Sequence, residues 1–385
     1  MEITKLIELS KISTPFYVFD INILKERISE IKNRLPNNTQ LCYAIKANSF
    51  ILNYIKDEDL LFEVCSPGEL SICEKYKVNP SKIVFSGVCK TQEDIDRAYA
   101  LKVKTITLES VLHCQYFVNT VKKSNYVHTQ EVIIRLTGGN QFGMSSEDVD
   151  NCISILKGLD SVIIRGIHFF TGTQKKLNKI HDEVEFIQKY CDELQLRNNI
   201  SFDSIEYGPG LSFNYFNLDD ESTNYSELET FSSMIKESKY NYVIELGRYI
   251  ASSCGTYVTK IMDVKKNGNS NYIIIDGGIN HINYYGQMMG MKLPSVKHIG
   301  KDITENSEKY TICGSLCTTA DVVLRELSLS AAKTDDLLAF ENIGAYSITE
   351  GIYLFLSHPL PEVYISENNK ILKVRNMIET YEINS

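Results

Sequence analysis

The chain has 385 residues, of which 43% are hydrophobic and 23% are charged, which is ordinary for a globular protein large enough for a barrel-sized domain and a smaller one. Its 40 basic and 49 acidic residues give a formal net charge of −9, and nowhere do lysine and arginine gather densely enough to follow a phosphate backbone, so we expect no nucleic-acid partner. The N-terminal segment is interrupted by charges and no stretch approaches the ~20 apolar residues of a membrane span, so we expect a cytoplasmic protein without a membrane partner.

Short β-rich runs alternate with amphipathic helical patterns through the first two thirds of the chain, which is typical of repeated βα units around a parallel sheet. Apolar residues that recur every three or four positions predict helices over 68–78, 92–102, 146–159 and 176–196. Eight strands separated by helices favour a closed (β/α)8 TIM barrel over an open sheet. The predicted strands are 41–48, 60–66, 82–87, 105–109, 132–137, 163–170, 204–207 and 242–246.

After Arg248 the sequence changes to short β-type runs with little helix between them, which predicts an antiparallel β-sandwich or barrel-like domain. We therefore predict a barrel over 16–250 and a β domain over 251–385, joined by residues 1–15. Barrel enzymes carry their chemistry at the C-terminal ends of the strands. The polar residues at those ends are Lys46, Ser66, His168, the turn 208–210 and the segment 245–248.

Lys46 lies in the sequence YAIKAN, inside a predicted strand and between Ile45 and Ala47. A lysine that is desolvated has a depressed pKa and becomes an amine nucleophile toward an aldehyde. A lysine at a strand end can equally extend its ammonium into solvent, and the pattern alone leaves both interpretations open.

Two further segments follow the last predicted strands of the barrel. The sequence YGPGLSF contains Gly208 and Gly210, which leave backbone amides open to a phosphate because glycine has no Cβ, although glycine turns are also common in ordinary loops. Glu245 ends the eighth strand in the sequence IELGR, where it either pairs with Arg248 or faces the barrel mouth.

The ten cysteines are scattered, form no CxxC pair and have no histidine spacing suited to zinc. We expect reduced thiols that mostly fill the core, and no metal site. Cys317 has unusual polar neighbours in Thr318, Thr319 and Asp321, although a buried hydrophobic role is the alternative. Tyr346, one of 23 tyrosines, has the alternative of an ordinary aromatic residue.

These motifs occur in the order found in the fold type III decarboxylases, the group of diaminopimelate, ornithine and arginine decarboxylases related to alanine racemase, and they resemble that family from about Thr14 to about Val363. The specificity lies in the ordered set rather than in one motif. The resemblance implies the alanine racemase-like fold and pyridoxal 5′-phosphate as cofactor. The motifs are YAIKAN (43–48), FEVCSPGEL (62–70), GIHFFTGTQ (166–174), YGPG (207–210), ELGR (245–248), CTTAD (317–321) and GAYS (344–347).

The resemblance also implies residue roles. Lys46 would carry the cofactor as a Schiff base, and Glu245 would bind the pyridine nitrogen, which makes the ring a strong electron sink. Cys317 would be the acid that returns a proton, supplied across the interface of a symmetric homodimer with shared active sites. The phosphate would be held by Gly208, Gly210, Gly247 and Tyr346. The remaining cofactor positions are Ser66, His168, Phe170 and Arg248, and the substrate positions are Arg248, Thr318, Asp321 and Tyr284.

Several positions depart from the family pattern. Phe170 stands where the family usually stacks a histidine on the ring, and His168 matches a different family position. Thr318 replaces the glutamate that recognises the diaminopimelate ammonium, and the sequence HINYYGQMM after residue 280 replaces the segment whose arginine grips the distal carboxylate. Two distal charges left unpaired in a buried site would be costly, which argues against free diaminopimelate.

The segments DGGIN (276–280) with YYGQ, LCTTAD and FLSHPLPEV (355–363) resemble more closely a divergent branch with the butirosin-type decarboxylase of carrier-protein-bound glutamate and siderophore-pathway decarboxylases. We therefore predict a carboxy-lyase that acts on an amino acid or an amino-acid conjugate, with a carrier-tethered substrate included. Diaminopimelate decarboxylase is one alternative. A racemase is disfavoured by Glu245, because racemases of this fold place an arginine beside the ring nitrogen. A catalytically silent cofactor-binding or regulatory protein is the alternative from another class.

Overall fold

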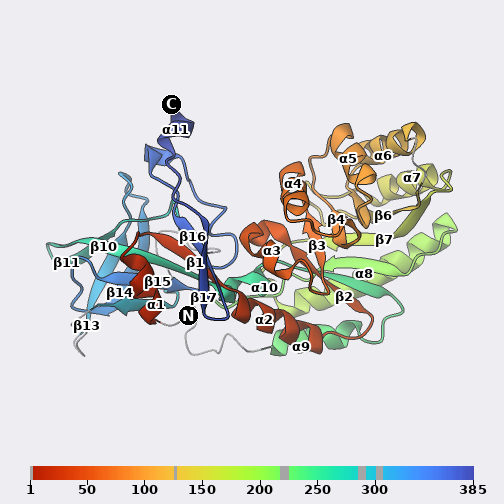
Figure 1. Cartoon of the computed structure of the whole chain (residues 1–385). Helices are drawn as coiled ribbons and strands as arrows, with labels where there is room; N and C mark the ends of the chain where they lie inside the picture. The colour runs from red at the N-terminus through yellow and green to blue at the C-terminus, as the bar shows by residue number, and fades with distance from the viewer. Residues whose placement is uncertain (1–2, 125–127, 217–224, 285–291, 301–306) are drawn as a thin grey trace. The chain divides into compact units, whose positions relative to one another are not determined.

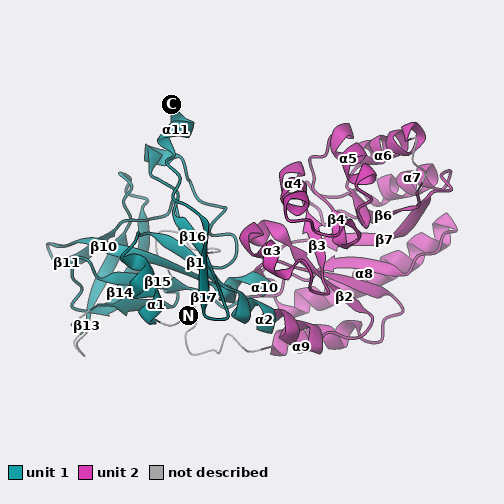
Figure 2. Cartoon of the chain, in the orientation of Figure 1, with its two compact units in different colours: residues 1–27, 213–223, 250–385 teal, residues 28–212, 224–249 magenta. Residues whose placement is uncertain are grey.

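The computed structural model describes residues 3–124, 128–216, 225–284, 292–300 and 307–385. The chain forms two compact units, which Figure 2 colours separately: residues 28–212 and 224–249, here the barrel unit, and residues 1–27, 213–223 and 250–385, here the β unit. The predicted boundary near residue 250 lies where the last segment of the β unit begins. Residues 16–27 differ from the prediction, because strand β1 (Phe16–Asp20) pairs with β10 and β16 of the β unit.

Eight parallel strands close into a barrel in the barrel unit, with β2 also pairing with β9 (Figure 1). Each observed strand overlaps one predicted strand, and the closed TIM barrel is confirmed. The strands are β2 (Thr39–Ala44), β3 (Leu61–Val64), β4 (Ile83–Phe85), β5 (Thr105–Leu108), β6 (Gln130–Arg135), β7 (Val162–Phe170), β8 (Ser204–Gly208) and β9 (Asn241–Leu246).

Four of the helices between these strands begin after a residue whose side chain caps the helix. Ser66, Thr91, Ser110 and Ser145 each accept a hydrogen bond from the backbone N–H three residues later, which satisfies a free amide at the helix start. The four predicted helices correspond to α4, α5, α7 and α8. The helices are α2 (Ile21–Arg34), α3 (Leu52–Ile55), α4 (Pro67–Lys75), α5 (Gln92–Ala100), α6 (Val111–Lys123), α7 (Ser146–Leu156), α8 (Leu177–Asn198), α9 (Ser226–Ile235) and α10 (Arg248–Ala251).

The β unit is built on a nine-stranded sheet whose main path runs β14-β13-β11-β10-β1-β16-β17, with β15 joining β10 to β12. Most pairs are antiparallel as predicted, but β1 runs parallel to β16 and β11 runs parallel to β13, so the sheet is mixed. Helix α1 (Ile3–Ser10) contributes Leu6 and Leu9 to its core. The other strands are β10 (Gly255–Asn267), β11 (Ser270–Ile275), β12 (Val296–Ile299), β13 (Ser307–Cys313), β14 (Val322–Ser330), β15 (Leu337–Glu341), β16 (Glu362–Glu367) and β17 (Lys370–Arg375), and a short helix α11 (Tyr381–Asn384) follows.

None of the helices in the described part of the chain has both the length and the apolar composition needed to cross a membrane.

Candidate active site

Lys46 lies in the 3-10 turn η1 (Ile45–Ala47) directly after β2, at the C-terminal end of the barrel. Its Nζ is 3.0 Å from Glu63 Oε2 on β3 and 3.4 Å from Cys65 Sγ. The side chain is 41% exposed, so of the two interpretations that the sequence pattern leaves open, the structure favours an ammonium that extends into solvent. Strand β2 ends at Ala44, two residues before Lys46 and four residues before the predicted strand end, and Glu63 holds an amine that solvent can reach at the barrel mouth.

The β3–α4 turn beside Lys46 is fixed by hydrogen bonds to the backbone. Ser66 Oγ accepts from Glu69 N at 3.1 Å, and Cys65 N donates to Glu69 Oε2 at 2.6 Å. Ser66 therefore shapes the turn that follows β3, and its contact with the cofactor stays a prediction.

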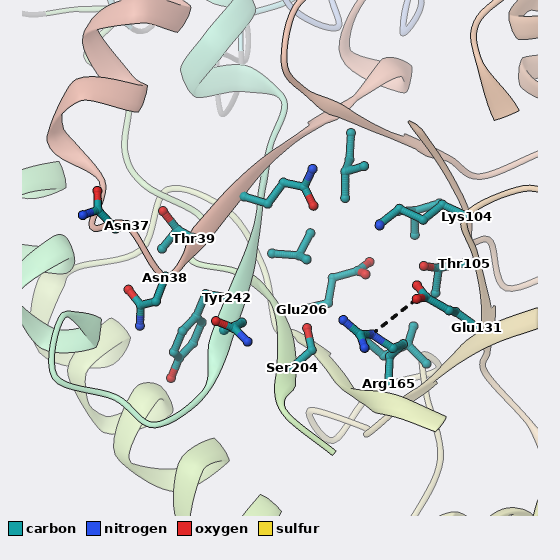
Figure 3. A pocket seen from close by; sticks show the side chains of 16 residues that line it. Asn37, Asn38, Thr39, Lys104, Thr105, Glu131, Arg165, Ser204, Glu206 and Tyr242 are labelled. Carbon is teal, nitrogen blue, oxygen red and sulfur yellow. Dashed lines mark ion pairs between the residues drawn. The ribbon is translucent and has the colours of Figure 1, made fainter. Parts of the chain in front are cut away.

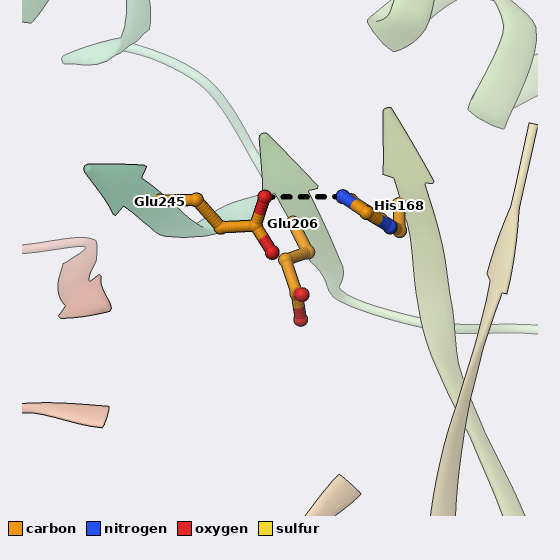
Figure 4. Close-up of side chains that lie close together, drawn as sticks. All are labelled: His168, Glu206 and Glu245. Carbon is orange, nitrogen blue, oxygen red and sulfur yellow. Dashed lines mark hydrogen bonds and ion pairs between the residues drawn. The ribbon is translucent and has the colours of Figure 1, made fainter. Parts of the chain in front are cut away.

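Three buried titratable side chains meet inside the barrel, as Figure 4 shows: His168 on β7, Glu206 on β8 and Glu245 on β9. One nitrogen or oxygen atom of each lies within 4.8 Å of the others, and His168 Nε2 is 3.2 Å from Glu245 Oε2. Because His168 Nε2 is already hydrogen-bonded, we interpret the group as a cluster of proton-sharing side chains rather than as metal ligands. Glu206 was not predicted from the sequence, although a glutamate within the apolar strand SIEYG was a usable signal.

The two carboxyl groups of this cluster differ in their electrostatic surroundings. Burial raises the pKa of Glu206 well above its ordinary value, and the nearby charge of Glu245 raises it further. Burial also acts to raise the pKa of Glu245, but His168, a hydrogen bond with Glu206 and the charge of Lys46 outweigh it and leave this pKa below its usual value. Glu245 is therefore the carboxyl group of this pair that is ionised and can pair with a cation.

The turn after β8 has room only for glycine at two positions. A Cβ at Gly208 would lie 2.4 Å from Cδ2 of the Phe170 ring, and a Cβ at Gly210 would lie 2.3 Å from the Gly172 carbonyl oxygen. Gly210 also has a φ of +61°, in the left-handed region that favours glycine. The turn thus presents backbone without side chains, as a phosphate cradle requires.

A buried ion pair contacts the backbone of this turn. Lys175 Nζ is 2.6 Å from Glu183 Oε2 and 3.2 Å from the Gly208 carbonyl oxygen, while the Lys175 backbone N–H donates to the Gly210 carbonyl at 2.9 Å. Tyr207 donates its hydroxyl to the same Glu183 oxygen at 2.8 Å. The sequence analysis missed this group, although Glu183 falls among the apolar positions of the predicted helix 176–196.

The remaining predicted cofactor residues of the barrel unit also end strands. Phe170 is the last residue of β7, and its partly buried ring lies beside Gly208. Gly247 and the buried Arg248 directly follow β9. A second ion pair that the sequence analysis missed, Arg135 Nη1 to Glu109 Oε2 at 2.8 Å, lies buried at the ends of β6 and β5.

Two predicted substrate residues of the β unit are buried and hydrogen-bonded to its backbone, and their contact with a substrate stays a prediction. Asp321 is 2% exposed and accepts hydrogen bonds from Ile279 N at 2.9 Å and Leu316 N at 2.7 Å, so its carboxylate holds the backbone of the Cys317 loop. Tyr284 is equally buried at 2%, and its hydroxyl donates to the Glu341 carbonyl at 2.6 Å. Their side chains are thus occupied within the fold of the β unit.

The other candidates of the β unit remain accessible. Cys317 is exposed and Thr318 is partly exposed. Tyr346 has a φ of +64°, and its carbonyl accepts from the N–H groups of Thr349 and Glu350. The second part of HINYYGQMM, residues 285–289, lies outside the described residues.

Residues 21–252 match the family model described as "Pyridoxal-dependent decarboxylase, pyridoxal binding domain". The chain belongs to this family. It is a decarboxylase of an amino acid or an amino-acid conjugate with pyridoxal phosphate as its cofactor, and the predicted enzyme class and cofactor are confirmed.

Relatives with curated functions extend the match to both units of this decarboxylase. A Staphylococcus aureus 2-[(L-alanin-3-ylcarbamoyl)methyl]-2-hydroxybutanedioate decarboxylase is 28% identical, over 92% of this chain and 94% of the relative. The L-glutamyl-[BtrI acyl-carrier protein] decarboxylase of Niallia circulans is 27% identical, over 97% and 93%. The crystal structure of a diaminopimelate decarboxylase from M. jannaschii superimposes with a TM-score of 0.84 at 21% identity and covers 98% of this chain and 93% of its own, which supports the fold.

Proposed function

We propose that this decarboxylase acts on an amino acid whose far end is joined to a larger group, rather than on free diaminopimelate. The observation that carries the proposal is the lack of a charged partner at the two positions where the resemblance leads us to expect contacts to the distal ammonium and carboxylate. Thr318 occupies the first position. The segment HINYYGQMM follows DGGIN at the second position, and the one side chain in it that could become a cation, His281, is 3% exposed, with its pKa lowered by burial to about 4.

His281 cannot act as the missing cation. Its Nε2 lies 3.1 Å from the Pro359 carbonyl oxygen and its Nδ1 lies 3.1 Å from the Tyr257 hydroxyl, so both ring nitrogens are occupied inside the β unit. A histidine with this lowered pKa is neutral at physiological pH.

The names of two relatives agree with a conjugated substrate. The S. aureus enzyme is named for an alanine unit attached through a carbamoyl group, and the N. circulans enzyme for glutamate attached to an acyl-carrier protein. In both names the amino acid is joined to a larger group through an acyl linkage. A pocket without the distal charge pair suits such a linkage.

The barrel mouth fits the cofactor. Lys46 would hold its aldehyde carbon, the Gly208–Gly210 turn with Gly247 would hold its phosphate, and Glu245 would hold its ring nitrogen. An ionised carboxylate has about four acceptor sites, and the hydrogen bond with His168 occupies one of them at Glu245. When bound, pyridoxal phosphate supplies an electron sink for cleavage of the bond between Cα and the carboxylate.

The protein's own residues then set the direction of the reaction. Arg248 would orient the substrate carboxylate, and Phe170 would cover one face of the ring by dispersion, without donating a hydrogen bond. Cys317 would return a proton to Cα as a general acid, as an exposed thiol at a loop tip can.

We place Cys317 in the active site of a second subunit, in a homodimer with shared sites. An exposed apolar patch on the β unit supports such an assembly, and its two segments are joined by a hydrogen bond from Asn384 Nδ2 to the Leu354 carbonyl oxygen at 2.7 Å. Ten free thiols support a reducing, cytoplasmic location. The patch comprises Leu354, Phe355, Leu356, Ile378, Tyr381 and Ile383.

The test measures cofactor attachment and substrate choice separately. Purified protein with pyridoxal phosphate should be coloured, and borohydride should fix a phosphopyridoxyl group on Lys46 that a Lys46→Ala variant lacks. Release of CO2 and amine is then compared for free diaminopimelate, ornithine, lysine, arginine and carrier-loaded glutamate. We expect product from a conjugate, and activity on diaminopimelate alone would overturn the substrate proposal.

A pair of cysteine variants tests the proton donor. Cys317→Ala should slow amine formation at least tenfold if the thiol contributes as a general acid, for which a contribution of about 10²–10⁴-fold is typical. Cys89→Ala is the control, because Cys89 is also an exposed thiol. Equal rates in the two variants would remove Cys317 from the mechanism.

A further inference from the structure

We propose that Glu206 holds a proton that it shares with Glu245, and that Glu206 is thereby a positioning residue that keeps Glu245 ionised toward the cofactor. This inference rests on the proposed cofactor role of Glu245. It adds a residue that the family motifs used above did not single out, and it links the active site to a cavity at the opposite end of the barrel.

The geometry requires a proton between the two carboxyl groups. Glu206 is 1% exposed and Glu245 is 9% exposed, and the two side chains belong to the cluster whose atoms lie within 4.8 Å of one another. Oε1 of each carboxyl is buried and has no hydrogen-bond donor among the described residues. Two buried anions at this separation repel and leave two acceptors unsatisfied, whereas one shared proton relieves both costs.

The neighbours decide which of the two carboxyl groups carries this proton. Glu245 receives a hydrogen bond from His168 and the attraction of Lys46, and both favour its ionised form. Among the described residues, Glu206 forms no ion pair, and the charge of Arg135 favours its ionisation. The proton therefore resides on Glu206, whose hydroxyl donates to Glu245. The titratable groups that face Glu206 are Glu245 from β9, His168 from β7, Glu63 from β3, Arg135 from β6 and Cys42 from β2.

A cavity gives this proton a path to solvent. Figure 3 shows Glu206 among the residues that line a cavity of about 220 Å³ at the N-terminal ends of the barrel strands. Its lining extends from the buried Ser204 to the exposed Asn37 and Asn241. A water molecule needs about 10–15 Å³ of such volume and two or more polar partners, so the cavity has room for several. Glu206 can thus exchange its proton at the end of the barrel away from Lys46.

The first test needs no cofactor. A carboxyl group that is protonated in the folded protein but ionised in the unfolded chain lowers stability as the pH rises above the unfolded pKa of about 4.3. Glu206→Gln removes this penalty and retains a neutral donor. Thermal melts of the cofactor-free protein should therefore show the variant to be more stable than the wild type at pH 8. Between the unfolded pKa of about 4.3 and the folded pKa of Glu206, each unit of pH increase should raise the advantage of the variant about tenfold in the folding equilibrium constant.

The same substitution at Glu183 is the matched control. Burial acts to raise the pKa of Glu183, but Lys175 and two hydroxyl donors outweigh it and lower this pKa, so Glu183 stabilises the fold as an anion. Glu183→Gln should therefore be less stable than the wild type at pH 7, and the difference should shrink as the pH falls below about 4.3 and through the folded pKa of Glu183. A Glu206→Gln variant that behaves like Glu183→Gln would overturn the proposal.

Infrared spectroscopy provides a second measurement on the same proteins. The folded wild type at neutral pH should show the carbonyl stretch of a protonated carboxylic acid, and Glu206→Gln should lack it. A spectrum without this band in the wild type would show that Glu206 is ionised and would also overturn the proposal, even if the variant melts at too low a temperature for comparison.

The holoenzyme separates hydrogen bonding from packing. Glu206→Gln keeps a donor toward Glu245, whereas Glu206→Leu has a similar size without one. Cofactor affinity should stay within about threefold in the glutamine variant and fall at least tenfold in the leucine variant, the loss expected from one buried hydrogen bond to a charged group. Equal affinities would exclude the positioning role. If the wild type binds no pyridoxal phosphate, the proposed function fails, while the melts and the infrared band still test Glu206.

Discussion

The Lys175–Glu183 ion pair, which contacts the Gly208–Gly210 turn, allows a prediction of the stability lost when one partner is removed. The two side chains are 7% and 5% exposed and 2.6 Å apart. Removing one partner of a buried pair costs about 3–5 kcal/mol, because the remaining charge is left uncompensated. In Lys175→Met, Glu183 keeps its hydrogen bonds from Tyr207 and Thr171, so we expect the lower end of that range, about 3 kcal/mol.

The assay is thermal unfolding of the cofactor-free protein, followed by circular dichroism or calorimetry. For a unit of this size, about 1 kcal/mol corresponds to roughly 2–4 °C, so the midpoint of Lys175→Met should fall by roughly 6–12 °C. Cofactor affinity should fall as well, because Lys175 Nζ also donates to the Gly208 carbonyl at 3.2 Å.

The chain contains its own control for this substitution. Lys179 pairs with the same Glu183 carboxyl, but at 3.6 Å and with 61% of its side chain exposed. An exposed pair is worth about 0–1 kcal/mol, so Lys179→Met should shift the midpoint by no more than about 4 °C. Equal shifts in the two variants would refute the reasoning that burial makes the first pair important.

Three further outcomes are expected. Gly210→Ala should still fold but should bind the cofactor at least tenfold more weakly, because the new Cβ meets the Gly172 carbonyl. Gly139→Ala is the control, since Gly139 has a φ of +91° but open space around it, and it should leave the affinity unchanged in a fluorescence titration. The contribution of Glu183, whose pKa is lowered, should be present above about pH 4.3 and be lost as the pH falls through the folded pKa, which melts between pH 7 and pH 3 would show. Arg135→Met should cost about 3 kcal/mol in urea unfolding, because Glu109, at 4% exposed, then keeps a buried charge without its cation.

The barrel was predictable from the sequence because its signals are local. Each strand is a short run of β-branched and aromatic residues, and the periodic apolar positions of 146–159 and 176–196 match α7 and α8. The location of β1 was not predictable in this way. The sequence FYVFD suits either sheet, and its place is decided by pairing with β10 and β16, which lie more than 200 residues away in the chain.

The residues of the candidate site also differ in whether local sequence signals could predict them. Lys46, Gly208, Gly210 and Glu245 could be placed at the barrel mouth because strand ends mark it. The partners Glu206 and Glu183 could not, since their importance depends on which side chains the closed barrel and its covering helices bring together. A charged residue inside an otherwise apolar strand or helix face was the one available sign.

Residues next to a motif were the least predictable. Asp321 lies four positions after Cys317, and the motif suggested a substrate contact for it. Each oxygen of its carboxylate accepts a backbone N–H, from Ile279 and from Leu316, so the same side chain shapes the loop. Sequence position within a motif therefore did not distinguish a residue that shapes the loop from one that the loop presents.

Glu206 and Glu245 show how barrel topology gives two similar carboxyl groups different tasks. Both are glutamates on adjacent strands of one barrel, and burial alone would keep both protonated. Strand β7 and the turn after β2 bring His168 and Lys46 close to Glu245, whereas Glu206 faces the cavity at the N-terminal end, where no cation touches it among the described residues. A shared proton then lowers the negative charge of the interior without removing the ionised carboxylate. Removing His168 should move this proton toward Glu245, and the site would lose its anion although both glutamates remain.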